Sequence, residues 1–191
     1  MNKKDSPIII NLIEKGIAST SISQLSKDIE IDYKTVYEIV KRLEKEDIIT
    51  LEKFGKAYNV ILNKKNHPII FEAEYKRRET LLKNPDFKIL YHKLNNLPFP
   101  FIGLIFGSQA KNDAHPRSDI DLLIICEQNR ENEFESLISL LPLNIDLNIF
   151  NFEEFISMIK NKEFTVVSEA INNNIILVGI EEYYRMLEHA K

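Results

Sequence analysis

Apolar residues form two short continuous runs in the middle of the chain, at positions 101–106 and 122–126. Runs of this length, bounded by polar residues, predict two buried strands. The first run ends at Gly107-Ser108, and the polar segment that follows it predicts one or two turns of helix. Residues 144–150 alternate between polar and apolar, which predicts a half-buried strand. We expect this third strand to run antiparallel to the first pair.

Three aspartates lie on or beside these strands. Asp119 and Asp121 are two residues apart at the start of the second strand, so their side chains project from one face. Asp146 lies on the polar face of the third strand and reaches the same site if the two strands pair. Carboxylates this close repel each other unless a cation lies between them. Three such ligands suit Mg²⁺ or Mn²⁺, whereas a solvent-facing carboxylate is the alternative interpretation of Asp146.

The turn after the first strand offers a place for an anion. Gly107 allows phosphate to approach closely, and Ser108 opens a helix whose N–H groups, with its own hydroxyl, can cradle anionic oxygens. Lys111 can meet phosphate charge, and Ser118 can cap or orient the turn at Asp119. An ordinary surface or turn residue is an equally good interpretation of Lys111 and Ser118.

This set of residues resembles the nucleotidyltransferase superfamily that includes DNA polymerase beta. Gly107-Ser108 ends one strand, and Ser118-Asp119-Ile120-Asp121-Leu122 opens the next, as in the minimal branch with its pattern G-S-x-A-R-G…S-D-I-D-L. The resemblance covers about residues 97–180. The one departure is Lys111-Asn112, where the family usually has Arg-Gly; lysine keeps the charge but loses the bidentate grip on phosphate.

The resemblance also implies roles for individual residues. Asp119 and Asp121 would bind a metal ion together with the triphosphate of a nucleotide, with ATP favoured. Asp146 would join the catalytic metal and activate an attacking hydroxyl, so the three aspartates would be both catalytic and metal-binding. The nucleotide would be held by Gly107, Ser108, Lys111 and Ser118.

The first third of the chain has a different pattern. Helical spacing of apolar residues predicts helices at 7–16, 22–29 and 33–46, and two strands follow at 48–53 and 57–62. Asp32 is well placed to cap the third helix. Three helices followed by a β-hairpin resemble the winged helix-turn-helix family, which implies that the third helix enters the DNA major groove.

The candidate DNA-binding residues lie on the third helix and on the hairpin: Tyr33, Lys34, Thr35, Tyr37, Lys41, Arg42, Lys53 and Lys56. The lysines and the arginine would contact phosphates, and the tyrosines and threonine would approach bases or sugars. Acidic residues interrupt this surface, among them Glu38, Glu44 and Glu46. An ordinary solvated helix face is therefore the alternative interpretation.

These predictions give an α+β fold with three parts. Residues 1–65 form a winged helix-turn-helix domain, residues 66–96 form linker helices, and residues 97–191 form a nucleotidyltransferase domain with a mixed sheet flanked by helices. The polar segment 63–68 favours a boundary there. The linker helices carry more apolar residues than a linker needs, so a homodimer surface is a further expectation; they are Ile69, Ile70, Phe71 and Tyr75.

Charge and cysteine content refine this picture. The net charge of −4 argues against a generally basic nucleic-acid coat, but residues 1–65 carry +2 and the remainder −6, which indicates different partners. Cys126 is the single cysteine, so no internal disulfide can form, and a reducing cytoplasm is expected. The apolar run at 8–10 is too short for a signal peptide or a membrane span, so no membrane partner is expected.

Two functions remain open. The first is a metal-dependent transfer of a nucleoside monophosphate to a hydroxyl acceptor, coupled to DNA binding. The minimal branch includes antitoxins that adenylylate a partner toxin, so the resemblance makes a protein acceptor or toxin partner a candidate. The toxins carry Arg-x(4–6)-His, which Arg185 and His189 do not match. The second is a transcriptional regulator whose nucleotidyltransferase fold only senses nucleotide; an antibiotic-modifying transferase ranks third, because it has no use for a DNA-binding domain.

Overall fold

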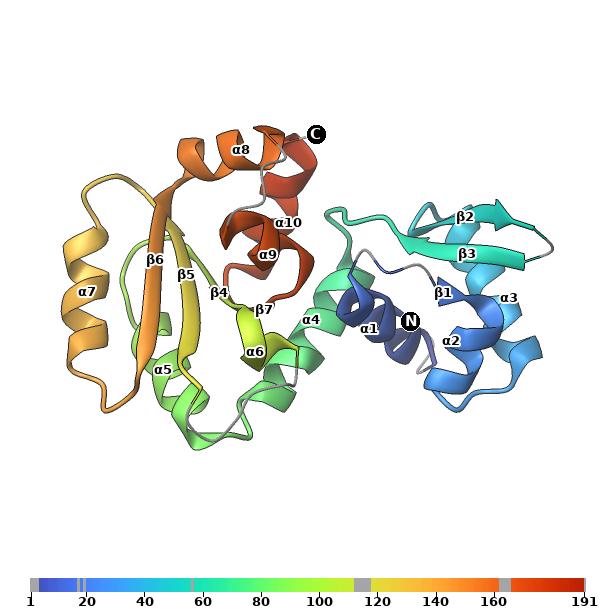
Figure 1. The fold of residues 1–191 in the computed structure, drawn as a ribbon, viewed down its shortest axis with the longest axis horizontal. Helices are drawn as coiled ribbons and strands as arrows, with labels where there is room; N and C mark the ends of the chain where they lie inside the picture. The colour runs from blue at the N-terminus through green and yellow to red at the C-terminus, as the bar shows by residue number, and fades with distance from the viewer. Residues whose placement is uncertain are drawn as a thin grey trace. The chain divides into compact units, whose positions relative to one another are not determined.

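A computed structural model describes residues 4–16, 18, 20–55, 57–111, 118–161 and 166–190. The chain forms two compact units, Met1–Ala73 and Glu74–Lys191, and Figure 1 shows the elements of each. The division falls inside helix α4 (Pro68–Leu81), which therefore contributes residues to both units. The fold class is α+β, as predicted.

Helices and a small sheet make up the first unit. Its elements are α1 (Asp5–Lys15), β1 (Thr20–Ser21), α2 (Ile22–Asp28), α3 (Tyr33–Lys45), β2 (Ile49–Phe54) and β3 (Ala57–Leu62). The strands are antiparallel in the order β1-β3-β2. Ile9, Leu25 and Val40 lie in the core with no exposed surface. This is the element order of a winged helix-turn-helix, with β2 and β3 as the wing.

Local signals explain where the helices of this unit begin. The Asp32 carboxylate accepts the N–H of Thr35 at 2.9 Å, which satisfies one of the unpaired donors in the first turn of α3. Ser21 caps α2 in the same way, by accepting the N–H of Gln24. Strand β1 was not predicted, because its two residues, Thr20 and Ser21, look like capping residues in the sequence.

A mixed sheet organises the second unit. The described strands are β4 (Ile102–Ile105), β5 (Ile120–Cys126), β6 (Ile145–Asn151) and β7 (Ile175–Val178), in the order β6-β5-β4-β7. The helices are α5 (Pro85–Asn95), α6 (Gly107–Ala110), α7 (Glu131–Ser139), α8 (Phe152–Asn161), α9 (Val166–Asn172) and α10 (Ile180–His189).

Strand β6 runs parallel to β5, so the expected antiparallel direction was wrong. An alternating pattern indicates a half-buried strand but carries no information on its direction. Helix α7 lies between the two strands in the chain and provides the crossover that a parallel pair requires. Both strands therefore start at the same end of the sheet, where β4, antiparallel to β5, finishes. The register pairs Asp121 with Asp146.

One face of this sheet packs on a hydrophobic core that α5 and α7 cover. Leu122 and Ile124 of β5 belong to it, together with Leu90 of α5 and Phe134 of α7. In Figure 1, α7 lies beside β6, and α9 and α10 lie on the other side of the sheet. Because side chains alternate along a strand, Asp121 projects from the opposite face. Asp121 shares that face with Leu123 and Ile125, which are also fully buried, so it lies at the end of an otherwise apolar face.

The structure bears on the expected homodimer surface and on the expectation that the chain has no membrane partner. The linker residues Ile69 and Ile70 are buried within a single chain, so their apolar character does not by itself require a dimer. No described helix combines the length and the apolar character that crossing a membrane demands.

Candidate functional site

Two of the three predicted aspartates are neighbours in the sheet. Asp121 and Asp146 are register partners on parallel strands, so their backbones lie about 4.8 Å apart and their side chains share a face. Asp121 is half-buried and Asp146 is exposed. The strand adjacency that brings Asp146 to the site cannot be obtained from spacing alone.

Gly107 lies directly against the carboxylate of Asp121. It begins α6 with a φ of +65°, and a Cβ at this position would be 2.0 Å from Asp121 Oδ2. The N–H of Phe106 also donates to the carbonyl of Asp121 at 3.1 Å. A glycine is therefore required here both for the backbone conformation and for the space that the carboxylate occupies. Ser108, the next residue, is half-buried on α6.

Asp119 is held from the neighbouring strand. The side-chain amide of Asn144 donates to Asp119 Oδ1, and the Asn144 carbonyl accepts the N–H of Ile120 at 2.9 Å. Asn144 thus starts the β5–β6 ladder and orients the first carboxylate of the Asp-x-Asp pair. The alternating pattern at 144–150 puts Asn144 on the polar face of its strand but assigns it no role. Ser118, just before Asp119, is half-buried.

A fourth carboxylate and a lysine complete the surroundings of Asp121. Burial raises the pKa of Asp121, and the neighbouring carboxylates of Asp146, Glu169 and Asp119 raise it further. Lys111, which follows α6, donates to Glu169 Oε1 at 2.7 Å. Sequence reasoning missed Glu169, because a single acidic residue in the helix α9 carries no local motif. Asn112, the other residue of the departure from the family pattern, lies outside the described residues.

These oxygens have the right chemistry for a hard divalent cation. Burial first, and then the neighbouring carboxylates, raise the pKa of Asp121, and a cation beside it would oppose both effects. Within the described ranges, no three side chains of His, Cys, Asp or Glu already converge as a metal site. Asp119 is engaged by Asn144 and Glu169 by Lys111, whereas Asp121 and Asp146 form an adjacent pair. A site with three aspartate ligands stays a prediction.

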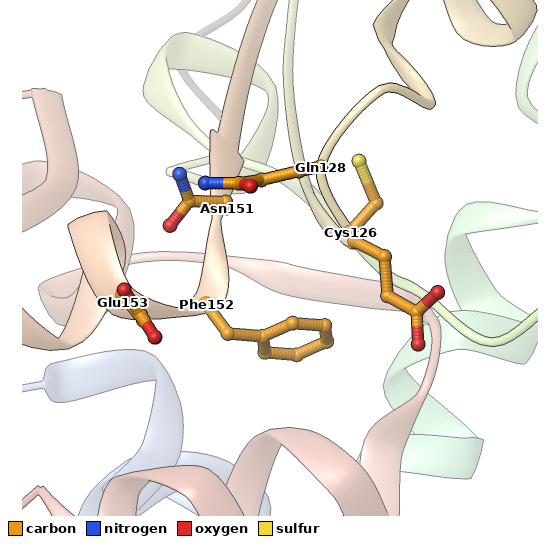
Figure 2. A pocket seen from close by; sticks show the side chains of 6 residues that line it. Cys126, Gln128, Asn151, Phe152 and Glu153 are labelled. Atoms are coloured by element: carbon orange, nitrogen blue, oxygen red, sulfur yellow. The ribbon is translucent and has the colours of Figure 1, made fainter.

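A separate open pocket of about 330 Å³ lies at the other end of β5 and β6. Figure 2 shows the amides of Gln128 and Asn151 near its rim and the ring of Phe152 beneath them. It lies about 16 Å along the strand from Asp121, at 3.3 Å per residue. The thiol of Cys126 is buried, which raises its pKa to about 11, as expected of a packed core residue. This pocket therefore does not belong to the acidic site.

The predicted DNA-binding surface exposes aromatic and basic side chains. The rings of Tyr33 and Tyr37 stack on α3 with centroids 6.2 Å apart, and both are exposed. Lys34 is exposed on the same helix, and Lys53 on the wing pairs with the exposed Tyr58 across the hairpin. Thr35 is half-buried, with its N–H on Asp32. Lys56 lies outside the described residues.

Two other members of this set have partners within the chain. Arg42 pairs with the buried carboxylate of Asp5 at 2.5 Å and with Glu46 at 3.3 Å, so it ties α3 to α1. Lys41 forms an ion pair with Glu44 one turn later, and this pairing raises the pKa of Lys41. Any contact of Arg42 or Lys41 with a DNA phosphate has to compete with these carboxylates.

Comparisons with known proteins bear on the second unit. Residues 89–183 match the model of the family described as Polymerase beta, Nucleotidyltransferase, so this stretch is similar to that family. None of the curated proteins matches the chain significantly. A solved structure titled as that of TrmBL2, an archaeal chromatin protein with a novel mode of DNA binding, is 14% identical with a TM-score of 0.30. That match covers 85% of this chain and 70% of the other.

Proposed function

We propose that the domain at residues 89–183, which matches the polymerase beta-type nucleotidyltransferases, transfers a nucleoside monophosphate from a nucleoside triphosphate to a hydroxyl acceptor. The observation that carries this proposal is the packing of Gly107 on Asp121, with Asp146 as the register partner of that aspartate. The family's phosphate-binding turn and its acidic residues thereby meet at one end of the sheet. The acceptor is an unidentified hydroxyl, and a tyrosine of a partner protein is a candidate.

In this proposal the three aspartates bind the metal ion, and Asp146 also activates the attacking hydroxyl. Asp121 and Asp146 would hold Mg²⁺ or Mn²⁺ as the central pair, and Asp119 would be the third ligand if its hydrogen bond with the Asn144 amide opened. The cation, when bound, neutralises charge on the triphosphate and on the attacking oxygen. Asp146 activates the hydroxyl, whose oxygen bonds to the α-phosphorus while pyrophosphate leaves. Positioning and charge neutralisation account for most of the expected rate.

The phosphate groups approach the turn after β4. Gly107 leaves the backbone open to close approach, and Ser108 offers its hydroxyl and N–H to the phosphate oxygens. Lys111 and Ser118 complete the proposed nucleotide contacts. Lysine forms a point contact with phosphate where the family's arginine forms a bidentate one, so weaker transition-state stabilisation is expected.

A labelling experiment tests this function. The full-length protein is incubated with α-labelled ATP and Mg²⁺, and transfer to itself or to candidate acceptor proteins is followed, with Asp121→Asn as the inactive variant. Asp86→Asn, on the exposed start of α5, is the matched charge-removal control. Transfer by the wild type and the control, abolished in Asp121→Asn, supports the enzyme.

The second candidate is a regulator that binds nucleotide without transferring it. It is favoured by Lys111, which stands where the family has arginine and is already paired with Glu169. Binding of ATP with Mg²⁺ by calorimetry, with no transfer to any acceptor tested, would support this sensor and count against the enzyme.

We further propose that the first unit binds DNA through α3 and the wing, as the exposed tyrosines with Lys34 and Lys53 suggest. Gel shifts with the DNA upstream of the gene, repeated across salt concentrations, test this. Lys34→Ala and Lys53→Ala should each lower the slope of log affinity against log salt by about 1, since each removes one phosphate contact. Lys88→Ala, which removes an exposed lysine of α5 in the second unit, is the control. An equal effect of all three variants would contradict this interface.

A further inference from the structure

Lys111 and Glu169 form an ion pair beside the acidic site. Lys111 Nζ lies 2.7 Å from Glu169 Oε1, and both side chains are about two-fifths exposed. The N–H of Lys111 donates to the carbonyl of Gly107, so the lysine follows Gly107 by one helical turn. Gly107 in turn packs on the carboxylate of Asp121. The pair therefore connects the proposed phosphate-binding turn with α9 at the edge of the site.

Glu169 sits on a firmly anchored helix. Val167 and Ala170 of α9 are buried, and the side-chain amide of Asn174 donates to the Ala170 carbonyl at 2.5 Å and to the Tyr183 hydroxyl at 3.0 Å. The Asn174 carbonyl accepts a hydrogen bond from the buried Arg77 guanidinium at 2.7 Å. These contacts fix where the Glu169 carboxylate can reach.

The charges of the site make this pairing competitive with phosphate binding. The carboxylate of Glu169 already acts on Asp121, together with Asp146 and Asp119, so it adds to the negative field that a triphosphate must enter. Among the described residues, Lys111 is a cation at the edge of the site that can offset part of this field, and it is paired with Glu169. A phosphate oxygen and the Glu169 carboxylate would compete for one ammonium group.

We propose that Glu169 is a positioning residue that holds Lys111 in the nucleotide-free site and passes it to the phosphate groups when a nucleoside triphosphate binds. This inference rests on the proposed nucleotide-binding function of the same site. Pairing keeps the long lysine side chain at the edge of the site. In exchange, every nucleotide has to break the ion pair, so Glu169 lowers the apparent affinity for phosphate.

The size of the effect follows from the exposure of the pair. Ion pairs with this much solvent contact are weak, and the fold-change in binding should be correspondingly small. Glu169→Gln should therefore strengthen the binding of a polyphosphate about two- to fivefold. Lys111→Gln should weaken it, because the phosphate loses its cation.

The test is a double-mutant cycle measured by calorimetry on the full-length protein. Inorganic tripolyphosphate with Mg²⁺ is the probe, since it carries the phosphate charges without any base. The variants are Glu169→Gln, Lys111→Gln and the two combined, and Lys111→Arg, which keeps the cation, is the conservative variant. Circular dichroism and thermal melting of each variant show that it is folded.

The expected result is that Glu169→Gln strengthens binding more in the wild type and in Lys111→Arg than in Lys111→Gln, where only the loss of its own charge acts. An equal gain in all backgrounds would overturn the inference, because Glu169 would then act only through its own charge. A loss of affinity in Glu169→Gln would overturn it as well and would make Glu169 a metal ligand. If the wild type does not bind the probe, the proposed nucleotide site itself is refuted. If the wild type binds it and Glu169→Gln binds it with the same affinity, only the inference about Glu169 is refuted.

Discussion

Replacement of Gly107 by alanine is expected to disable the acidic site while leaving the fold intact. The added Cβ would be 2.0 Å from Asp121 Oδ2 and 2.8 Å from Asp121 Cγ. These atoms belong to the outer part of a side chain, so the clash can be relieved by rotation of the Asp121 carboxylate. That rotation removes the carboxylate from its position beside Asp146.

The cost in stability comes mainly from the backbone. A residue with a Cβ at a φ of +65° costs about 1–2 kcal/mol relative to glycine. For a chain of this size, such a loss lowers the melting temperature by about 2–8 °C. In the proposed metal site the cost in function is larger, because a displaced ligand should reduce metal affinity by roughly 10- to 100-fold.

The assay is calorimetric binding of ATP as a function of Mg²⁺ concentration, combined with thermal melting. Gly55→Ala is the matched control, because Gly55 has a similar φ of +59° but no atom within 4 Å of the position of a Cβ. Both variants should lose similar stability, and only Gly107→Ala should lose Mg²⁺-dependent binding. Wild-type binding in Gly107→Ala would refute the conclusion that this glycine makes room for the Asp121 carboxylate.

Four further predictions concern buried residues of the second unit, with an exposed residue of the first unit as one control. Phe134→Ala should lower the unfolding free energy, measured in urea, by about 3–5 kcal/mol, because Phe134 is fully buried. The control Phe54→Ala should change it by less than about 0.5 kcal/mol, because Phe54 is 73% exposed. Equal losses in the two variants would contradict the assignment of Phe134 to the core. Glu74→Gln should cost about 3–5 kcal/mol, since it removes the carboxylate that lies 2.6 Å from the buried Arg77 guanidinium. A loss below about 1 kcal/mol would show that this carboxylate is not needed to balance the buried charge. Cys126 has a pKa of about 11 through burial, so its thiol should react with a disulfide reagent at pH 8 far more slowly in the native protein than in urea. Because this pKa is raised by folding, the folded state should also lose stability as pH rises from about 9 towards 11, and a pH-independent midpoint would contradict it.

Local patterns in the sequence were enough to predict most of the secondary structure. The run at 122–126 became the buried end of β5, and Asp32 caps α3 as expected. The Asp-x-Asp spacing alone was sufficient to predict that Asp119 and Asp121 lie together at one end of that strand. These features depend on neighbouring residues only, and the periodicity of a helix or strand records them directly.

The contacts that define the site depend on residues far apart in the chain. The direction of β6 follows from the crossover through α7, and it decides that Asp146 stands beside Asp121. Asn144 reaches Asp119 over 25 residues, and Lys111 reaches Glu169 over 58.

The amino-acid order by itself therefore determined the elements, their caps and the kind of chemistry that the aspartates and the glycine-serine turn can support. Only the tertiary structure decided which carboxylates meet, which amide orients Asp119 and which acid holds Lys111. The physical reason is that a strand's pattern specifies which of its faces is buried, whereas its neighbours are chosen by the topology of the whole sheet.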